Sequence, residues 1–310
     1  MSNMNGGVMK SQRARVGAGY QPPALPFAQL PNPDSVLGRV YTASDVGPAP
    51  GIELIAAPGR WRPRGGRQVL AMRTNNPVTV QSLTDQIAET IGPFPGGFVR
   101  AGMQLRCALA FFSGGIGTGA KIAQMWIGNS GSVSSAGTFS YLNNTGNNIN
   151  SNGEMEGRID VRSDTNAQHY ARPGAGPNAN GVLALSNGFF HTLSLASNPT
   201  VIFSSPWEIA VVLRSAAETA VNISSATWAG GIATFNTSAA HTLAVGDKTV
   251  IAGVTPSGYN IPAGAIVLSV PTTTQFTVAL AADPGTYTSG GTSSRISNVT
   301  SQSYVLELVG

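Results

Sequence analysis

Two strand-like regions near the end of the chain are separated by a long segment of different composition, and this break most constrains the fold. The stretch WEIAVVLRSAAETAVNIS at 207–224 ends one series of strands, and SYVLELVG at 303–310 supplies one more. The segment between them is almost free of charge and rich in Thr, Gly, Ser and Ala. A domain inserted at a loop tip leaves its host intact when the ends of the insertion stay close together. We therefore expect a host domain whose last strands are split by an inserted domain.

Short strand signals recur along the host part, with Gly, Pro and Asn between them. In several of them apolar and polar residues alternate, so that Met103, Leu105 and Cys107 share one face of a strand. The runs lie at 38–44, 51–57, 68–74, 103–112, 120–128, 157–163, 189–197 and 207–215. Many short strands with such turns predict an all-β fold, specifically a jelly-roll-like sandwich.

One segment leaves its secondary structure open. A helix pattern is almost absent from the chain, and SLTDQIAETIG at 82–92 is the one candidate. Ser82 or Thr84 would cap such a helix, because both side chains can accept a hydrogen bond from the first turn. The same residues fit a loop followed by a strand equally well.

The inserted segment carries strand signals of its own. These runs lie at 231–238, 248–254, 265–271 and 275–282. The turn sequences VGDK, TPSGYN and DPGTYTSGG separate them. We expect a small all-β domain at 226–297, inserted before the last strand of a jelly-roll-like domain formed by 39–225 and 298–310. Residues 1–38 contain five prolines and no sustained period, which predicts an extended N-terminal arm.

Positive charge is concentrated in the first third of the chain. Residues 1–110 contain eleven Lys and Arg against five Asp and Glu, whereas residues 111–310 contain seven against nine. The sequence RWRPRGGR interleaves arginines with a tryptophan: Arg60, Trp61, Arg62, Arg64 and Arg67. Such a patch could bind nucleic-acid phosphates, or its arginines could pair with carboxylates of a docking partner. We favour docking, since the patch is short and no nucleic-acid-binding module surrounds it.

Residues that commonly carry catalysis form no recognisable constellation. The three histidines, His169, His191 and His241, have no metal-ligand spacing. Cys107 lies on the apolar face of its strand. The run GGIGTGAK at 114–121 lacks the Gly-Lys-Ser/Thr ending of a phosphate loop. We therefore expect no metal and no cofactor.

A carboxylate pair is the remaining route to catalysis, because glycan hydrolysis uses two acidic side chains. Alternation along EMEGRIDVRSD would place four of them on one strand face: Glu154, Glu156, Asp160 and Asp164. Arg158 and Arg162 lie among them on the same face, so a solvated, salt-bridged strand fits equally well. We predict that the protein is not an enzyme.

Recognition could lie in the loop FSYLNNTGNNINSNGEMEG at 139–157. Asparagine amides offer paired donors and acceptors, and a tyrosine ring can stack on a sugar. The candidate binding residues are Tyr141, Asn143, Asn144, Asn147 and Asn148. Asn and Gly also favour turns, so a loop with no binding role is the alternative.

The inserted segment resembles a small β module of bacteriophage tail and fibre proteins. The resemblance lies in HTLAVGD, GVTPSGYN, VLSVPTTTQFT and GTYTSGGT, in that order, within 241–292. The chain departs from the module at IPAGA, 261–265, where the family more often continues directly into a strand. The host segments at 37–71 and 93–112 are similar to fibre or appendage proteins of tailed phages, as is the ending WEIAVVL…SYVLELVG.

This resemblance implies a structural protein of the virion, often trimeric, with no catalytic residue. We expect a homotrimer, assembled in the cytoplasm of the host bacterium, that docks to other virion proteins through its N-terminal arm and arginine patch. As a tail fibre or appendage it would contact the host surface, with a surface glycan as the candidate partner, and would not insert into a membrane. The first alternative is a capsid decoration or a collar or baseplate connector with a purely structural role. A glycan hydrolase is the second alternative.

Overall fold

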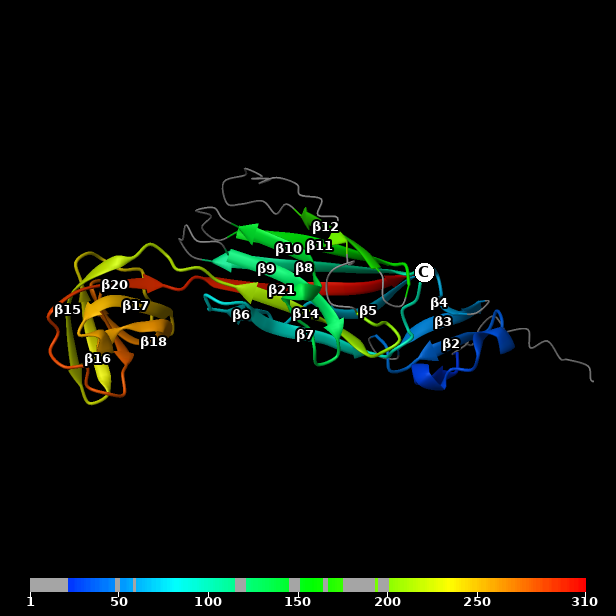
Figure 1. The fold of residues 1–310 in the computed structure, drawn as a ribbon, viewed down its shortest axis with the longest axis horizontal. Helices are drawn as coiled ribbons and strands as arrows, with labels where there is room; N and C mark the ends of the chain where they lie inside the picture. Colours follow the sequence, from blue (N-terminus) through cyan, green and yellow to red (C-terminus); the bar gives the residue numbers. More distant parts are fainter. Residues whose placement is uncertain are drawn as a thin grey trace, which may run out of the picture.

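The computed structural model describes residues 22–47, 51–57, 60–114, 121–144, 151–163, 167–174, 193–194 and 201–310. These residues form three open sheets and one closed barrel (Figure 1). Helical structure among them consists of short 3-10 turns: η1 (Phe27–Gln29), η2 (Pro33–Ser35), η3 (Ser135–Gly137) and η5 (Ser257–Tyr259). None of the helices described here is long and apolar enough to span a membrane. The expected all-β fold class is confirmed.

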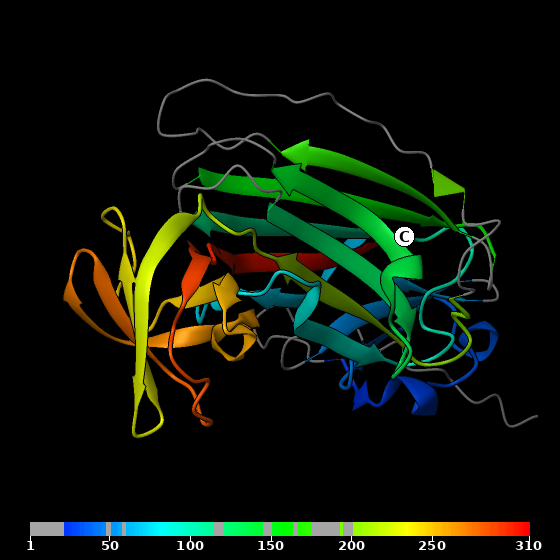
Figure 2. The same ribbon diagram turned by 60° about the vertical axis from the view of Figure 1, so that its left-hand side comes forward.

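Two sheets pack face to face in the middle of the molecule (Figures 1 and 2). The smaller sheet has the order β10–β9–β14–β7, with β7 (Gln86–Phe94), β9 (Lys121–Asn129), β10 (Thr138–Asn144) and β14 (Trp207–Arg214). The larger sheet has the order β13–β12–β11–β8–β21–β5, and β6 also pairs with β21. Its strands are β5 (Arg67–Arg73), β6 (Val78–Val80), β8 (Gln104–Gly114), β11 (Ser151–Val161), β12 (Ala167–Gly174), β13 (Leu193–Ser194) and β21 (Asn298–Val309).

Eight of these strands form a jelly roll. Strands β5, β21, β8 and β11 are neighbours in one sheet, and β7, β14, β9 and β10 are neighbours in the other. All six pairings between them are antiparallel. The chain leaves the sandwich after β14, forms the barrel, and returns as β21. The predicted jelly-roll-like sandwich with a small all-β domain before its last strand is therefore confirmed.

Alternating apolar residues supply the sandwich core. Four apolar side chains of β8 are buried on its inner face: Leu105, Cys107, Leu109 and Phe111. On the opposite sheet, Trp207 is fully buried and stacks on Phe94, with ring centroids 4.6 Å apart. Phe203 meets the same indole edge-on at 5.8 Å. Full burial of a large apolar side chain contributes about 1.5–3 kcal/mol, so these rings are a main source of stability for the sandwich.

The inserted domain is a closed six-stranded barrel with the order β15–β16–β19–β18–β17–β20. Its strands are β15 (Val221–Ala229), β16 (Ile232–Thr237), β17 (Lys248–Thr255), β18 (Ile261–Thr272), β19 (Gln275–Ala279) and β20 (Ser289–Arg295). Its core is separate from that of the sandwich. In this core Phe235 stacks on Phe276 at 5.4 Å and meets Tyr259 edge-on at 5.7 Å. The barrel thus has its own apolar interior.

A third sheet lies at the end of the sandwich opposite the barrel (Figure 1). It has the order β1 (Ala24–Leu25), β2 (Val40–Ala43), β3 (Ile52–Ala57), β4 (Arg60–Pro63). Of the arm expected at 1–38, the structure describes 22–38. Here β1 pairs in parallel with β2, and the ring of Phe27 meets Phe98 edge-on at 5.1 Å. This part of the arm therefore lies against its own chain.

The structure decides the secondary structure of one segment that the sequence left open, and it moves one predicted domain boundary. At 82–92, where helix and strand were both open, the structure has the strand β7 from Gln86 onward, paired with β14. The first barrel strand begins at Val221, before the expected boundary at Ala226. The residues before Ala226 were assigned to the host domain, because they follow the sandwich strand β14 after a short connection.

Candidate functional site

The aromatic residue of the arginine-rich segment is buried. Strand β4 alternates, so Trp61 faces the interior of the N-terminal sheet with 6 % of its surface exposed. Its ring meets Tyr41 edge-on at 5.4 Å. Because Trp61 is buried, its side chain is not accessible to another protein when the chain is folded. A docking role can therefore rest only on the arginines.

Most of these arginines have partners within the chain. Arg64 pairs with Glu53 at 2.7 Å, and Arg67 pairs with Glu307. The hydrogen bond from Arg67 to that carboxylate raises the pKa of the guanidinium. Arg60 donates to the carbonyl of Ala101 at 3.4 Å.

Arg62 differs from these three arginines. It is exposed and has no partner among the described residues. The arginine patch is thus a partly neutralised surface, with Arg62 as its uncompensated charge. Its role in docking stays a prediction.

The asparagine-rich loop is described only in part. The backbone of Tyr141, Asn143 and Asn144 belongs to β10, at the edge of the smaller sandwich sheet. Asn147 and Asn148 lie outside the described residues. Binding at this loop therefore also stays a prediction.

Cys107 and His241 occupy structural positions. Burial raises the pKa of the Cys107 thiol to about 12, which keeps it protonated. The Nδ1 atom of His241 accepts from the backbone N–H of Leu243 at 3.3 Å, and its ring meets Phe276 edge-on. His169 and His191 lie where no side chain is described. The described part of the chain contains no group of three or more metal-ligating side chains.

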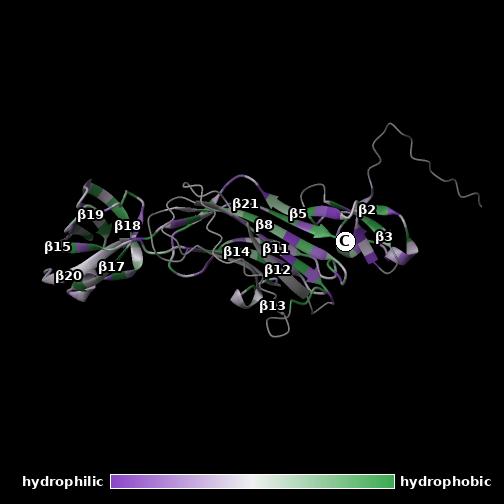
Figure 3. Cartoon of the chain, turned by 90° about the horizontal axis from the view of Figure 1, so that it is seen from above, coloured by the Kyte–Doolittle hydropathy of each residue, from purple (hydrophilic) through white to green (hydrophobic). Residues whose placement is uncertain are grey.

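The acidic strand β11 is a salt-bridged surface. Asp160 accepts from Arg158 and from Gln104, each at 2.7 Å. The hydrogen bond from Arg158 is the main reason why the pKa of Asp160 lies below its ordinary value. Glu154 and Glu156 are exposed on the same face. Figure 3 shows hydrophilic and hydrophobic residues alternating along β11, which pairs with β8.

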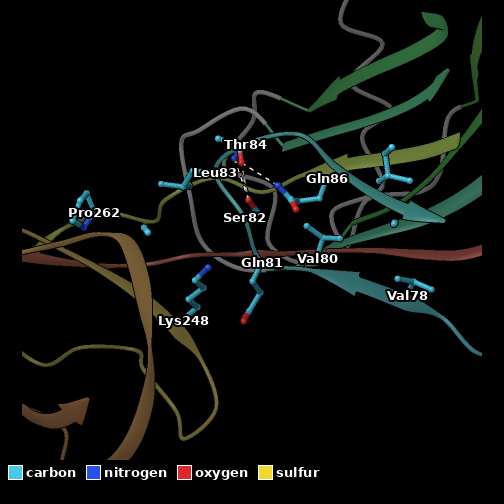
Figure 4. A pocket seen from close by; sticks show the side chains of 12 residues that line it. Val78, Val80, Gln81, Ser82, Leu83, Thr84, Gln86, Lys248 and Pro262 are labelled. Atoms are coloured by element: carbon cyan, nitrogen blue, oxygen red, sulfur yellow. Dashed lines mark hydrogen bonds between the residues drawn. The ribbon is translucent and has the colours of Figure 1, made fainter. Parts of the chain in front are cut away.

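A feature that the sequence did not reveal is a cleft between the sandwich and the barrel (Figure 4). Its volume is about 610 Å³. One wall is formed by β6, the start of β7 and the loop between them, and the other by the barrel strands β17 and β18. The lining residues are Val78, Val80, Gln81, Ser82, Leu83, Thr84, Gln86, Ile87, Ala88, Lys248, Pro262 and Ala263.

Hydrogen bonds tie each wall of the cleft to one of the two segments that connect sandwich and barrel. On the sandwich side, Ser215 donates its N–H to the carbonyl of Ser82 and its hydroxyl to that of Val80, both at 2.7 Å. On the barrel side, the N–H of Ile296 donates to the carbonyl of Lys248 at 2.7 Å. The two connecting segments meet at the β-bridge between Ala217 and Ile296. The cleft is therefore built into the junction.

One cation points into this cleft. Lys248 is the only charged residue among those that line it, and Figure 4 shows its amino group directed from the barrel toward the β6–β7 loop. The neighbouring Asp247 pairs instead with Arg295, at 2.8 Å. Arg295 also contacts Glu218 at 3.4 Å. Lys248 has no carboxylate partner among the described residues.

Gly264 shapes the path of this lysine side chain. The glycine has φ +80°, and a Cβ atom there would lie 3.0 Å from Cε and 3.1 Å from Cγ of Lys248. The lysine stem therefore lies directly against the glycine backbone, and a larger residue would displace it. The sequence showed only a VGDK turn and an IPAGA stretch, and could not indicate that the two meet.

Comparison of the chain with protein-family models, with curated proteins and with solved structures finds no significant match. Function must therefore be argued from the arrangement of the molecule itself.

Proposed function

We propose that the protein is a non-enzymatic structural component of a bacteriophage virion, a fibre or appendage that oligomerises as a trimer and contacts the host surface. A jelly roll alone does not decide this, because the architecture occurs in viral capsid proteins and lectins alike. The phage assignment itself comes from the resemblance in the sequence.

The observation that best supports attachment is the separation of the two ends of the molecule. The N-terminal sheet and the arginine patch lie at one end of the sandwich, and the barrel lies at the other (Figure 1). One end can dock to the particle while the barrel projects away from it. Few charged residues occur in the barrel, and such a surface suits weak contacts that many copies on one particle multiply.

Binding of the labelled full-length protein to intact cells tests this proposal, with cells of the bacterium in which the phage replicates. Its mass in solution, from light scattering, gives the oligomer number in the same preparation. Saturable binding by a trimer is expected. An intact trimer that does not bind would favour the purely structural connector or decoration, and a monomer that does not bind would contradict the proposal as a whole.

A further inference from the structure

We propose that the cleft between sandwich and barrel binds an acidic saccharide, with the sugar carboxylate paired to Lys248. This inference rests on the proposed attachment function, because it names the chemical class that such a protein would recognise. None of the described residues of the asparagine-rich loop or of the arginine patch lines this cleft.

The first step is the charge of the cleft. Lys248 is its only charged lining residue. Arg295 holds the neighbouring carboxylate of Asp247 at 2.8 Å and so prevents it from neutralising the lysine. A lone ammonium group in a partly enclosed site favours a single anionic group on the ligand. Nucleic acid fits poorly, since its binding relies on several phosphate contacts.

The second step is the neutral polar lining. The hydroxyls of Ser82 and Thr84 lie 3.2 Å apart, and Gln86 donates to the Thr84 hydroxyl at 3.1 Å (Figure 4). Gln81 also lines the cleft. Hydroxyl and amide groups both donate and accept hydrogen bonds. Sugar hydroxyls need this kind of uncharged, two-way hydrogen bonding.

The third step is the apolar part of the lining. Leu83 is 39 % exposed and Ile87 is 52 % exposed, although both are large hydrophobic residues. Val78, Val80 and Pro262 add further apolar surface. The C–H face of a sugar ring can cover such side chains. A volume of about 610 Å³ also lies within the range of about 300–1,000 Å³ for small-molecule sites, which often form at domain interfaces.

Titration of the full-length protein with trigalacturonate tests the proposal, followed by saturation-transfer NMR. Carboxyl-reduced trigalacturonate and glucose 6-phosphate are the matched probes. We expect saturable binding of trigalacturonate and at least about tenfold weaker binding of the reduced form, because loss of a charge-assisted hydrogen bond typically costs that factor or more. Equal binding of the reduced form, no binding of trigalacturonate, or tighter binding of glucose 6-phosphate would overturn the carboxylate assignment.

Variants of Lys248 test whether trigalacturonate binds in the cleft. Lys248→Met should weaken trigalacturonate binding at least about tenfold, whereas Lys248→Arg should retain most of it. Arg39→Met removes an exposed cation at the other end of the molecule and should change nothing. Unchanged binding by Lys248→Met, or equal losses in Lys248→Met and Lys248→Arg, would overturn the role of the lysine charge.

Cell binding separates this inference from the proposed function. If the wild-type protein and Lys248→Met bind host cells equally, attachment stands and the cleft is overturned as its site. If the wild-type protein binds trigalacturonate through Lys248 but binds no cells, the saccharide site stands and attachment falls.

Discussion

The sandwich and the barrel are both antiparallel β structures, yet different interactions hold them together. In the sandwich, β9 and most of β14 are buried on both faces. Ion pairs outside the core also connect its two sheets. For example, Arg73 of the larger sheet pairs with Glu89 of the smaller sheet at 2.9 Å. In the barrel, residues alternate between core and surface, and pairs of hydroxyl groups link neighbouring strands alongside the ion pair of Asp247 with Arg295. Ser269 and Thr277 lie 2.7 Å apart, and Thr249 and Ser293 lie 2.9 Å apart.

This difference indicates two units that fold with considerable independence. Each has its own apolar core, and closure of the barrel pairs its strand edges internally. The junction between them contains backbone hydrogen bonds and ion pairs around Glu218 and Arg295. Interfaces of this polar kind couple neighbouring domains weakly. The following variants test that independence.

The largest effect is expected from Trp207→Ala in the sandwich. Removing a fully buried indole that contacts two aromatic rings should lower the free energy of unfolding of the sandwich by about 3–5 kcal/mol. The single cysteine, Cys107, reports on this, because its thiol is buried and protonated until the sandwich opens. Its reaction with a thiol reagent should become much faster. Hydrogen exchange in peptides from 221–295 should stay unchanged, and joint acceleration would show one cooperative unit.

Phe235→Ala is the matching change in the barrel, with a somewhat smaller expected effect. The ring is fully buried against Phe276 and Tyr259, so its loss should destabilise the barrel by about 3–4 kcal/mol. Exchange should now accelerate in the barrel peptides, while the reactivity of Cys107 stays at the wild-type value. Increased reactivity of Cys107 would contradict independent folding.

The sequence predicted the architecture well because period-two alternation and turn residues are local signals. The inward set of β8, from Leu105 to Phe111, follows directly from that alternation. The start of β15 was assigned to the host domain instead of the barrel. Strand β20 was missed, since its sequence SGGTSSR contains almost no apolar residues. Closure of the barrel, which no local pattern encodes, makes it a strand.

The candidate sites were harder to predict, because they depend on contacts between distant residues. The basic segment was visible in the sequence, but its pairing with Glu53 and Glu307 was not. Alternation along RWRP could have indicated that Trp61 points inward. The cleft could not be predicted from the sequence. Asp247 does not neutralise its neighbour Lys248 because it pairs with Arg295, which lies 47 positions after the lysine.

A smaller effect is expected from Glu218→Gln at the junction. The carboxylate is 4 % exposed beside Arg295. Burial lowers the pKa of the nearby Lys121, and the charge of Glu218 offsets part of that effect. Losing its charge should weaken the junction by about 1–3 kcal/mol. Spin labels at Leu37→Cys and Val245→Cys, both exposed positions, should then show a broader distance distribution. Glu53→Gln, which removes the exposed pair at the other end, is the control. Equal widths in all three proteins would show that the ion pairs do not fix the barrel.

The smallest effect is expected from Asp160→Asn. It should depend on pH and should be confined to the sandwich. The hydrogen bond from Arg158 lowers the pKa of Asp160 below its ordinary value of 3.8. A depressed carboxyl pKa stabilises the fold above the ordinary value, and this contribution is lost as the pH falls through the folded value. The pair is partly exposed, so the contribution should be at most about 1 kcal/mol.

The unfolding midpoint of the sandwich should therefore differ between wild type and variant at pH 7, and the difference should shrink toward pH 3. The barrel midpoint should be the same in both proteins at each pH, because Asp160 lies on the sandwich strand β11. A difference in the sandwich that stays constant with pH would show that the ion pair does not stabilise it.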